Sequence, residues 1–317
     1  MRPFRLWLLA LGILGALGLA AFGAGLYFYL SPERAVRRAL DYERGLAGLA
    51  RREATLPGGM RYAYLEGGRG EPLMLLHGFG ANKDNFVRVA KYLTPHYRVI
   101  IPDHAGFGES AKPEAGDYSP RAQAERLRAL AQALGAPRPH LGGNSMGGHI
   151  ALTYAALYPA EVQSLWLLAP GGVWSAPPSE VRRAIEATGR NPMIVADEDE
   201  FARLVGQVTA VPLPIPRRFL DVLAQERIAN QALERRIFRQ LGEDAVEQRV
   251  RGLATPALIV WGAQDRVLHP ASAGILQMLL TRSDTVLLQG VGHLPMLEQP
   301  ERAALDYLRF RAALPAS

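Results

Sequence analysis

An uninterrupted apolar stretch occupies the N-terminal end of the chain. Residues 6–30 contain no charged side chain. A helix of this length, at about 1.5 Å per residue, would be roughly 37 Å long, which is enough to cross a bilayer with some tilt. Trp7 lies at one end and the aromatic residues 27–29 lie at the other, as in the aromatic belts of membrane interfaces. The pattern predicts a transmembrane anchor over residues 1–30.

A cleaved signal peptide is the alternative interpretation of this stretch. The apolar region of a signal peptide is only about 7–15 residues long and is followed by a small-x-small cleavage site. Ala21 and Gly23 supply such a site weakly, and the length of the stretch favours the anchor. Arginines flank both of its ends, so the positive-inside rule does not decide the orientation.

Small residues recur at every fourth position inside the predicted anchor. A stripe of this kind lets two helices pack closely, and it therefore predicts a homodimer formed through the transmembrane helix. The alternative is that glycine and alanine are simply frequent in membrane spans. The stripe consists of Gly12, Ala16, Ala20 and Ala24.

The segment after the anchor is amphipathic. Valine and leucine positions are separated by arginines over residues 33–52, and we expect a juxtamembrane helix within residues 31–56. Such a helix would lie on the membrane surface, or it would be a solvated link between the anchor and the domain. The sequence Pro-Gly-Gly at residues 57–59 ends it and predicts that the globular domain starts there.

From residue 60 onward, short apolar runs alternate with segments of helical periodicity. Strands that alternate with helices predict a largely parallel sheet with helices on both faces, which is an α/β fold. The expected strands span residues 60–65, 73–76, 97–101, 140–141, 165–168, 257–261 and 285–288, and the expected helices span residues 85–93, 121–134 and 146–158.

The pattern changes between residues 171 and 251. Helical segments dominate there, prolines cluster in VPLPIP, and no strong strand pattern occurs. We interpret residues 171–251 as a helical cap inserted into an α/β core that comprises residues 57–170 and 252–317. The cap would lie over the carboxyl ends of the strands, where open α/β sheets bind their ligands.

Composition and charge exclude several kinds of chemistry. The chain has no cysteine, which excludes disulfides, thiolate catalysis and cysteine-bound zinc. The net charge is +6, and residues 1–57 hold eight arginines and four acidic residues, so +4 of the +6 lies near the N-terminus. That position suits an anionic membrane surface better than nucleic acid. The chain also lacks an HExxH motif and a phosphate-binding loop, so we expect no metal, no cofactor and no nucleic-acid partner.

The segment LGGNSMGGHI contains a serine at the centre of a G-x-S-x-G pattern. Gly143, Ser145 and Gly147 form the pattern, with an expected strand before it and an expected helix after it. In a nucleophile elbow, a strand turns sharply into a helix and holds its serine in a strained conformation, and small neighbours let the two elements approach. The context therefore predicts that Ser145 is a catalytic nucleophile.

A serine nucleophile needs a base, and the base needs an orienting carboxylate. After such an elbow the acid and then the histidine follow in the chain, each in a loop behind a strand. PALIVWGAQD supplies Asp265 and TVLLQGVGH supplies His293 at these places. Other histidines fit less well, since His77 precedes the serine and His149 lies inside the elbow helix.

The tetrahedral intermediate of acyl transfer needs backbone donors for its oxyanion. One donor should be the amide that follows the nucleophile, which belongs to Met146, and the other should come from the loop after an earlier strand. That loop reads HGFGANKDNF and makes Phe79 the expected second donor, because flanking glycines let the main chain face the reacting oxygen.

Six segments together resemble the α/β-hydrolase superfamily: HGFGANKDNF, PDHAGFGES, GNSMGG, LLAPGG, LIVWGAQD and GVGHLPMLEQP. More narrowly, they resemble bacterial lipases and their animal relatives that hydrolyse monoacylglycerol and phospholipids, several of which carry an N-terminal membrane helix. The resemblance extends over residues 57–314. It implies Ser145 as nucleophile, Asp265 as acid and His293 as base, a cap that sets substrate choice, and a glycerolipid substrate. It also implies a single-pass protein of a bacterial inner membrane with a periplasmic domain.

Three other functions compete with this interpretation. Hydrolases of carbon–carbon bonds in aromatic-ring breakdown share GNSMGG and LLAPGG, but they tend to carry an aromatic residue after the catalytic histidine, where this chain has Leu294. A short-chain carboxylesterase would use the same triad. A binding protein that kept the fold would usually lack a triad member.

Epoxide hydrolases and haloalkane dehalogenases place an aspartate at the elbow, so Ser145 disfavours them and Asp103 is expected to be structural.

Overall fold

The computed structural model describes residues 7, 13–15, 17–19, 23 and 25–314. Within these ranges, no helix is long and apolar enough to cross a membrane. Much of the anchor predicted over residues 1–30, and all of the small-residue stripe inside it, lies outside the described residues. The described part of the chain that adjoins the domain, residues 25–30, is helical.

The described residues form one eight-stranded sheet in the order β1-β2-β4-β3-β5-β6-β7-β8. β1 and β2 pair antiparallel, as do β2 and β4, whereas every pairing from β4 through β3, β5, β6 and β7 to β8 is parallel. The mostly parallel sheet predicted from the sequence is confirmed. The strands are β1 (Leu49–Thr55), β2 (Arg61–Gly67), β3 (Pro72–Leu76), β4 (Arg98–Pro102), β5 (His140–Asn144), β6 (Leu165–Leu168), β7 (Ala257–Gly262) and β8 (Ser283–Leu288).

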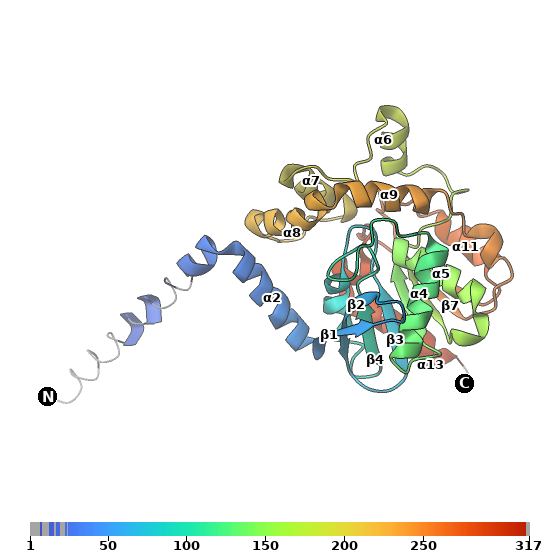
Figure 1. Cartoon of the computed structure of the whole chain (residues 1–317), viewed down its shortest axis with the longest axis horizontal. Coiled ribbons are helices and arrows are strands. Elements are labelled where there is room, and N and C mark those ends of the chain that lie inside the picture. The colour runs from blue at the N-terminus through green and yellow to red at the C-terminus, as the bar shows by residue number, and fades with distance from the viewer. Residues whose placement is uncertain (1–6, 8–12, 16, 20–22, 24, 315–317) are drawn as a thin grey trace.

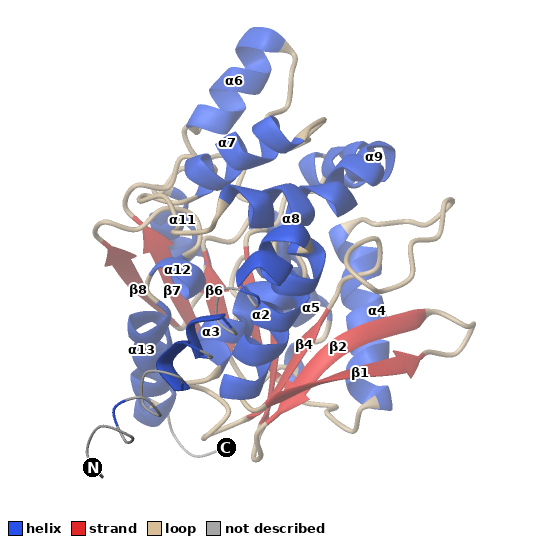
Figure 2. Cartoon of the chain, turned by 90° about the vertical axis from the view of Figure 1, so that its left-hand side faces the viewer, coloured by secondary structure: helices blue, strands red, loops and turns tan. Residues whose placement is uncertain are grey.

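Helices cover both faces of the sheet, as Figure 2 shows. β3, β6 and β7 are apolar along their length because both of their faces are buried, which is typical of parallel strands. Two hydrophobic clusters result, one shared with α4 and α5 and the other with α3 and α13. These helices are η1 (Lys83–Phe86), α3 (Val87–Ala90), α4 (Pro120–Ala133), α5 (Met146–Leu157), η2 (Pro159–Glu161), α11 (Ser272–Leu279), α12 (Pro295–Glu298) and α13 (Pro300–Ala313).

Residues 31–56, for which a juxtamembrane helix was expected, differ from that prediction. A helix, α2 (Pro32–Leu46), does form, but residues 49–55 make the edge strand β1, so the expectation of helix as far as residue 52 was wrong. The sheet therefore begins before residue 57. β1 carries exposed charged residues. Charged side chains are common on edge strands because they disfavour pairing with the strands of other chains. The same charges in the sequence LARREAT resemble the polar face of a helix.

The segment between β6 and β7 is helical, and its helices lie together beyond one end of the sheet (Figure 1). α8 also packs against α2, which follows the N-terminal segment. The cap is thus in contact with the chain that leads to the predicted anchor. Its helices are α6 (Glu180–Thr188), α7 (Glu198–Val208), α8 (Arg217–Ala229), α9 (Gln231–Gly242) and α10 (Glu247–Val250).

Asp103, which follows β4, is enclosed by hydrogen bonds. Its Oδ1 accepts from the Lys83 backbone N–H at 2.7 Å. Its Oδ2 accepts from the Lys83 ammonium at 2.7 Å and from the Glu109 N–H at 2.8 Å. Both carboxylate oxygens are therefore occupied in holding η1 and the segment around Glu109 to the end of β4, in keeping with the structural role expected from the sequence.

Candidate active site

Ser145 lies at the turn between β5 and α5. Its backbone has φ 53° and ψ −117°, a conformation that non-glycine residues rarely adopt and that stores strain. Three backbone hydrogen bonds hold it: the Ser145 N–H donates to Leu168 O at 3.1 Å, and Ser145 O accepts from the N–H groups of His149 and Gly171 at 3.0 and 2.9 Å. The strand–turn–helix context that the motif requires is present.

The glycines of the elbow are required by close packing. A Cβ atom at Gly147 would lie 2.0 Å from Leu76 O, and one at Gly143 would lie 2.4 Å from Gly147 O. Contacts this short with rigid backbone cannot be relieved, so only glycine lets α5 begin so near the ends of β3 and β5. The approach brings the loop after β3 beside the serine, where a Cβ at Gly78 would lie 3.3 Å from Ser145 Cβ.

Asp265 and His293 form a buried hydrogen-bonded pair. His293 Nδ1 lies 2.8 Å from Asp265 Oδ2, and that oxygen also accepts from Trp261 Nε1 at 3.0 Å. Asp265 Oδ1 accepts from the N–H groups of Val267 and Leu268 at 2.8 and 3.0 Å. Because a carboxylate only accepts, the proton of a neutral His293 ring lies on Nδ1, and Nε2 is left as the basic nitrogen.

His293 is fixed beside the elbow through its backbone. Asn144, the residue before Ser145, donates through Nδ2 to His293 O and to Leu168 O, each at 3.0 Å. His293 Nε2 is buried and has no hydrogen-bond partner in the described part of the chain. The structure thus pairs Asp265 with His293 and ties His293 to the residue adjoining Ser145. No hydrogen bond joins Ser145 to His293 among the described residues, and the catalytic roles of the three stay predictions.

His77 fixes the loop that carries the expected oxyanion donor Phe79. His77 Nδ1 lies 2.8 Å from Gly78 O, and His77 Nε2 accepts from the His104 N–H at 3.0 Å. Burial lowers the pKa of His77 to about 4, so the ring is neutral and Nδ1 is the donor. In a trans peptide the Phe79 N–H points opposite to Gly78 O. The ring of His77 therefore determines which way that N–H faces.

The two expected oxyanion donors have no partner of their own. In the described residues, neither the Phe79 N–H nor the Met146 N–H donates a hydrogen bond. Met146 is the first residue of α5, where helix N–H groups lack intrahelical acceptors and favour an anion. Both residues line the same cavity as Ser145. The assignment of these amides to an oxyanion hole stays a prediction.

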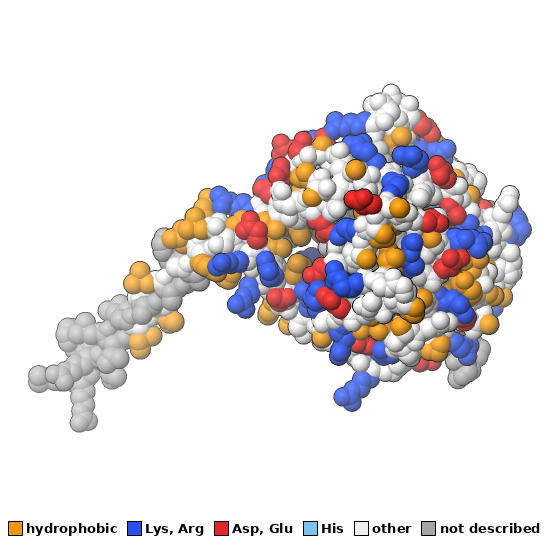
Figure 3. Space-filling view, viewed as in Figure 1, with side chains coloured by type: hydrophobic (Ala, Val, Ile, Leu, Met, Phe, Trp, Pro, Cys, Tyr) orange, Lys and Arg blue, Asp and Glu red, His pale blue; other side chains and the backbone are white. Residues whose placement is uncertain are grey.

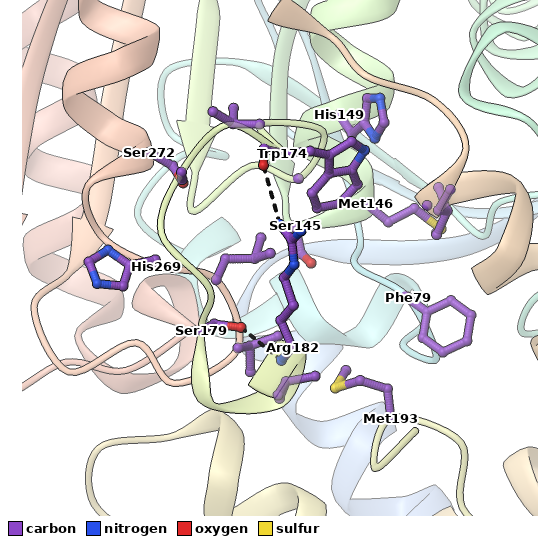
Figure 4. Close-up of a pocket in the computed structure, with 18 of the residues that line it drawn as sticks. Phe79, Ser145, Met146, His149, Trp174, Ser179, Arg182, Met193, His269 and Ser272 are labelled. Atoms are coloured by element: carbon purple, nitrogen blue, oxygen red, sulfur yellow. Dashed lines mark hydrogen bonds between the residues drawn. The ribbon is translucent and has the colours of Figure 1, made fainter. Parts of the chain in front are cut away.

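A cavity of about 390 Å³ adjoins Ser145. This volume falls within the range of small-molecule sites, about 300–1,000 Å³. Figure 4 shows Trp174, Met146 and Phe79 around it, with His269 and Ser272 on another wall. The core contributes the elbow and the loop before α11, and the cap contributes most of the apolar lining: Val173, Trp174, Ala176, Pro177, Val181, Ile185, Met193, Phe238 and Leu241.

A second histidine–carboxylate pair was not found from the sequence. His149 Nε2, on α5, lies 2.8 Å from Asp244 Oδ1, and Asp244 also accepts from Arg249 Nη1 and Nη2 at 3.0 and 2.8 Å. Burial alone would raise the pKa of Asp244, but the hydrogen bonds from His149 and Arg249 outweigh it and lower that pKa. Trp174 Nε1 donates to Asp244 O at 2.8 Å. This cluster joins the cap to the elbow helix.

The described residues hold no cluster of three histidine or acidic side chains that could ligate a metal ion. The chemistry available at the site is that of a hydroxyl, an imidazole, a carboxylate and free backbone N–H groups. These are the components of acyl transfer through a serine.

Comparisons with known proteins identify similar chains. The sequence pattern of the α/β hydrolase fold matches residues 71–300. Lipase 1 of Psychrobacter immobilis is 40% identical over 288 residues, which cover 88% of this chain and 90% of the relative. A monoacylglycerol lipase of Mus musculus is 28% identical over 316 residues, or 94% of this chain and 93% of the relative. A crystal structure of a membrane phospholipase A, a bacterial virulence factor, has a TM-score of 0.86 and 39% identity, covering 95% and 97% of the two chains.

Replacing Asn144 tests how His293 is positioned. Asn144→Ala leaves the carbonyls of His293 and Leu168 buried without this donor, which should lower the free energy of unfolding by about 1–3 kcal/mol. A displaced imidazole should also lower kcat for a short nitrophenyl ester, by up to about 100-fold. Gln163→Ala, which removes an exposed hydrogen bond to Arg138 O, is the control. Unchanged kcat in folded Asn144→Ala would show that this amide does not position His293.

Acidification should destabilise the protein before its carboxylates titrate. Burial lowers the pKa of His77 and of His140 to about 4 and that of His104 well below its usual value. The unfolded chain protonates these rings near pH 6.5, so it binds more protons and stability falls as the pH drops below that value. Urea unfolding between pH 7 and pH 5 should show this slope. His104→Phe removes one such ring and should flatten the slope, and an unchanged slope would refute the explanation.

Proposed function

The chain belongs to the α/β-hydrolase fold family, and we propose that it is a membrane-anchored serine hydrolase that cleaves carboxylic esters of glycerolipids. The ester-hydrolase class follows from the family and from the lipases that resemble most of the chain. One observation supports the mechanism above the others. Ser145, in a strained conformation, adjoins an apolar cavity. Asp265 and His293 are hydrogen-bonded to each other, and Asn144, the residue before Ser145, donates a hydrogen bond to His293 O.

The proposed reaction passes through an acyl-enzyme on Ser145. Ser145 Oγ attacks the ester carbonyl while His293 Nε2 takes its proton, and Asp265 stabilises the imidazolium that forms. The N–H groups of Phe79 and Met146 bind the oxyanion of the tetrahedral intermediate. Collapse of the intermediate expels the alcohol, which takes the proton from His293. Water then attacks the acyl-enzyme by the same steps and releases the carboxylic acid and free Ser145.

The cavity supports a lipid substrate. Side chains of α6, α9 and the segment after β6 form most of its apolar lining, and Arg182 is the only lysine, arginine or acidic side chain on its described walls. Burial of apolar area is the main favourable term available to a ligand there. We therefore assign the cavity to the acyl chain of the ester. The names of the lipase and phospholipase relatives point to the same substrate class.

The N-terminal segment supports attachment to a membrane. The described residues 26–30 are apolar and exposed, and Figure 3 shows hydrophobic side chains along the N-terminal arm. Residues 6–30 carry no charge, which fits a membrane span. Arg218 of α8 donates to Tyr29 O at 2.8 Å, so the cap contacts this arm. We propose a single-pass protein of a bacterial inner membrane with a periplasmic domain. A homodimer through the transmembrane helix stays a hypothesis from the sequence.

Hydrolysis by the purified full-length protein tests the substrate class. We expect turnover of a monoacylglycerol, a lysophospholipid or a diacyl phospholipid, and loss of that turnover in Ser145→Ala with unchanged thermal unfolding. Released fatty acid and a short nitrophenyl ester would be measured side by side. Retained lipid turnover in Ser145→Ala would refute the nucleophile. Turnover of the short ester alone would replace the lipase with a short-chain carboxylesterase or a carbon–carbon bond hydrolase.

Deleting residues 1–30 tests the anchor. The truncated protein keeps α2 and the whole sheet, and we expect it to leave the membrane fraction while hydrolysing the short ester. The full-length protein should stay in the membrane pellet after alkaline carbonate washing, because about 20 apolar residues suffice to span the hydrocarbon core. If the truncated protein still sediments with membranes, α2 or the cap binds lipid by itself and residues 1–30 are not the required anchor.

A further inference from the structure

A buried arginine of the cap reaches the loop that carries Phe79. Arg227 lies on α8 and is only 6% exposed. Its Nε and Nη2 donate to the two carboxylate oxygens of Glu234 on α9, at 3.0 and 2.9 Å, and Nη2 also donates to Met193 O at 2.6 Å. The guanidinium is thereby fixed in one orientation by two other parts of the cap, α9 and the loop of Met193.

The guanidinium lies directly against Gly80. Gly80 has φ +67°, and a Cβ atom there would lie 2.2 Å from the guanidinium carbon and 2.3 Å from Nη2. Arg227 thus fills the position that a side chain at residue 80 would occupy. Its guanidinium carbon is also 5.6 Å from the centre of the Phe79 ring, within the range of a cation–π contact.

The side chain of Phe79 packs against both the cap and the core. Its ring meets the Phe238 ring of α9 edge-on, with centroids 5.2 Å apart, and the Phe107 ring of the core, 5.8 Å apart. The backbone N–H of the same residue is the expected oxyanion donor. A displacement of α8 or α9 would therefore be transmitted to that N–H through the ring and through Gly80.

Behind the loop there is room for it to move. A cavity of about 160 Å³ has walls formed by Gly80 and Ala81 of the loop, Leu40 of α2, and Arg227 and Glu234 of the cap. A backbone segment that is tightly packed on all sides keeps its position when one contact is lost. A segment beside a cavity can shift into the empty space instead. Arg227 fills part of the space on this side of the loop.

An ion pair buried this deeply is a costly way to gain stability. Removing two charges from water costs several kcal/mol per ion, and apolar residues of similar volume often serve as well or better. A planar, always charged guanidinium does offer what an apolar side chain lacks, which is a fixed face and a fixed direction for each N–H. The pair is therefore better explained by the geometry that it imposes on the loop.

We propose that Arg227, held by Glu234, is a positioning residue that keeps the Phe79 N–H aimed at the oxyanion and so makes the chemical step depend on a seated cap. The inference rests on the proposed acyl transfer at Ser145. Arg227 is not among the residues that line the substrate cavity, so its loss should change kcat and leave KM for a small ester nearly unchanged.

The test measures kcat per active site. Folded variants are titrated with a phosphonate that reacts with serine hydrolases, and turnover of a short nitrophenyl ester is divided by the titrated sites. Loss of a whole oxyanion donor costs about 100- to 1,000-fold in kcat, so a misaimed donor should cost about 10- to 100-fold. Arg217→Met, on the exposed face of the same helix with partners Asp199 and Asp221, should keep the wild-type kcat.

Two variants separate positioning from folding. Arg227→Met/Glu234→Met removes both charges, so no unpaired ion is left buried, and it should fold with a lowered kcat. Arg227→Lys keeps a positive charge beside Glu234 but has no planar face for Gly80, and its kcat should fall as well. If either variant folds and keeps the wild-type kcat, the proposal is wrong. Ser145→Ala has no serine to titrate, so its turnover is measured per mole of folded protein. Its inactivity would show that the proposed acyl transfer holds independently, and activity there would instead refute that function.

Discussion

The close approach of α5 to the ends of β3 and β5 is the constraint on which the rest of the site depends. The backbone of Gly147 lies so near Leu76 O that a Cβ atom would be 2.0 Å from it. The turn at Ser145 has a positive φ, and backbone hydrogen bonds to Leu168, His149 and Gly171 hold this strained conformation. Ser145 lines the cavity at this turn, and the N–H groups that open α5 lack intrahelical acceptors, as at any helix N-terminus.

The remaining parts of the site reach this turn from elements distant in sequence. The loop after β3 is oriented by the neutral ring of His77. The loop after β8 is fixed by Asn144 through His293 O and by the end of α7, where Val208 O accepts from the His293 N–H at 2.8 Å. Each connection joins backbone to a rigid partner, so the arrangement is preorganised before any substrate binds.

The sequence predicted those features whose physical cause is local. The elbow motif, the acid after β7 and the histidine after β8 each follow a strand that was expected from the sequence, so their place at the same end of the sheet could be inferred from chain order. The edge strand β1 was missed because its arginines imitate the polar face of a helix. Asn144, Asp244 and Arg227 were missed for another reason. Asn144 and Asp244 have partners 149 and 95 residues away. Arg227 pairs with Glu234 nearby, but the loop at Gly80 that it contacts is distant in sequence, and no local pattern encodes such contacts.

The cap does more than cover the cavity, because its side chains contact core residues beside the candidate active site. His149 of the elbow helix pairs with Asp244 after α9, and Phe79 of the core packs against Phe238 of the same helix. The opposite side of the loop after β3 is held by α2, whose Arg44 donates to both carboxylate oxygens of Asp84 at 2.7 Å. The loop that carries Phe79 is thus held both from the cap, through Phe238, and from α2, through Asp84. The helix that follows the predicted anchor and the cap that lines the cavity therefore both contact the loop in which we propose an oxyanion donor.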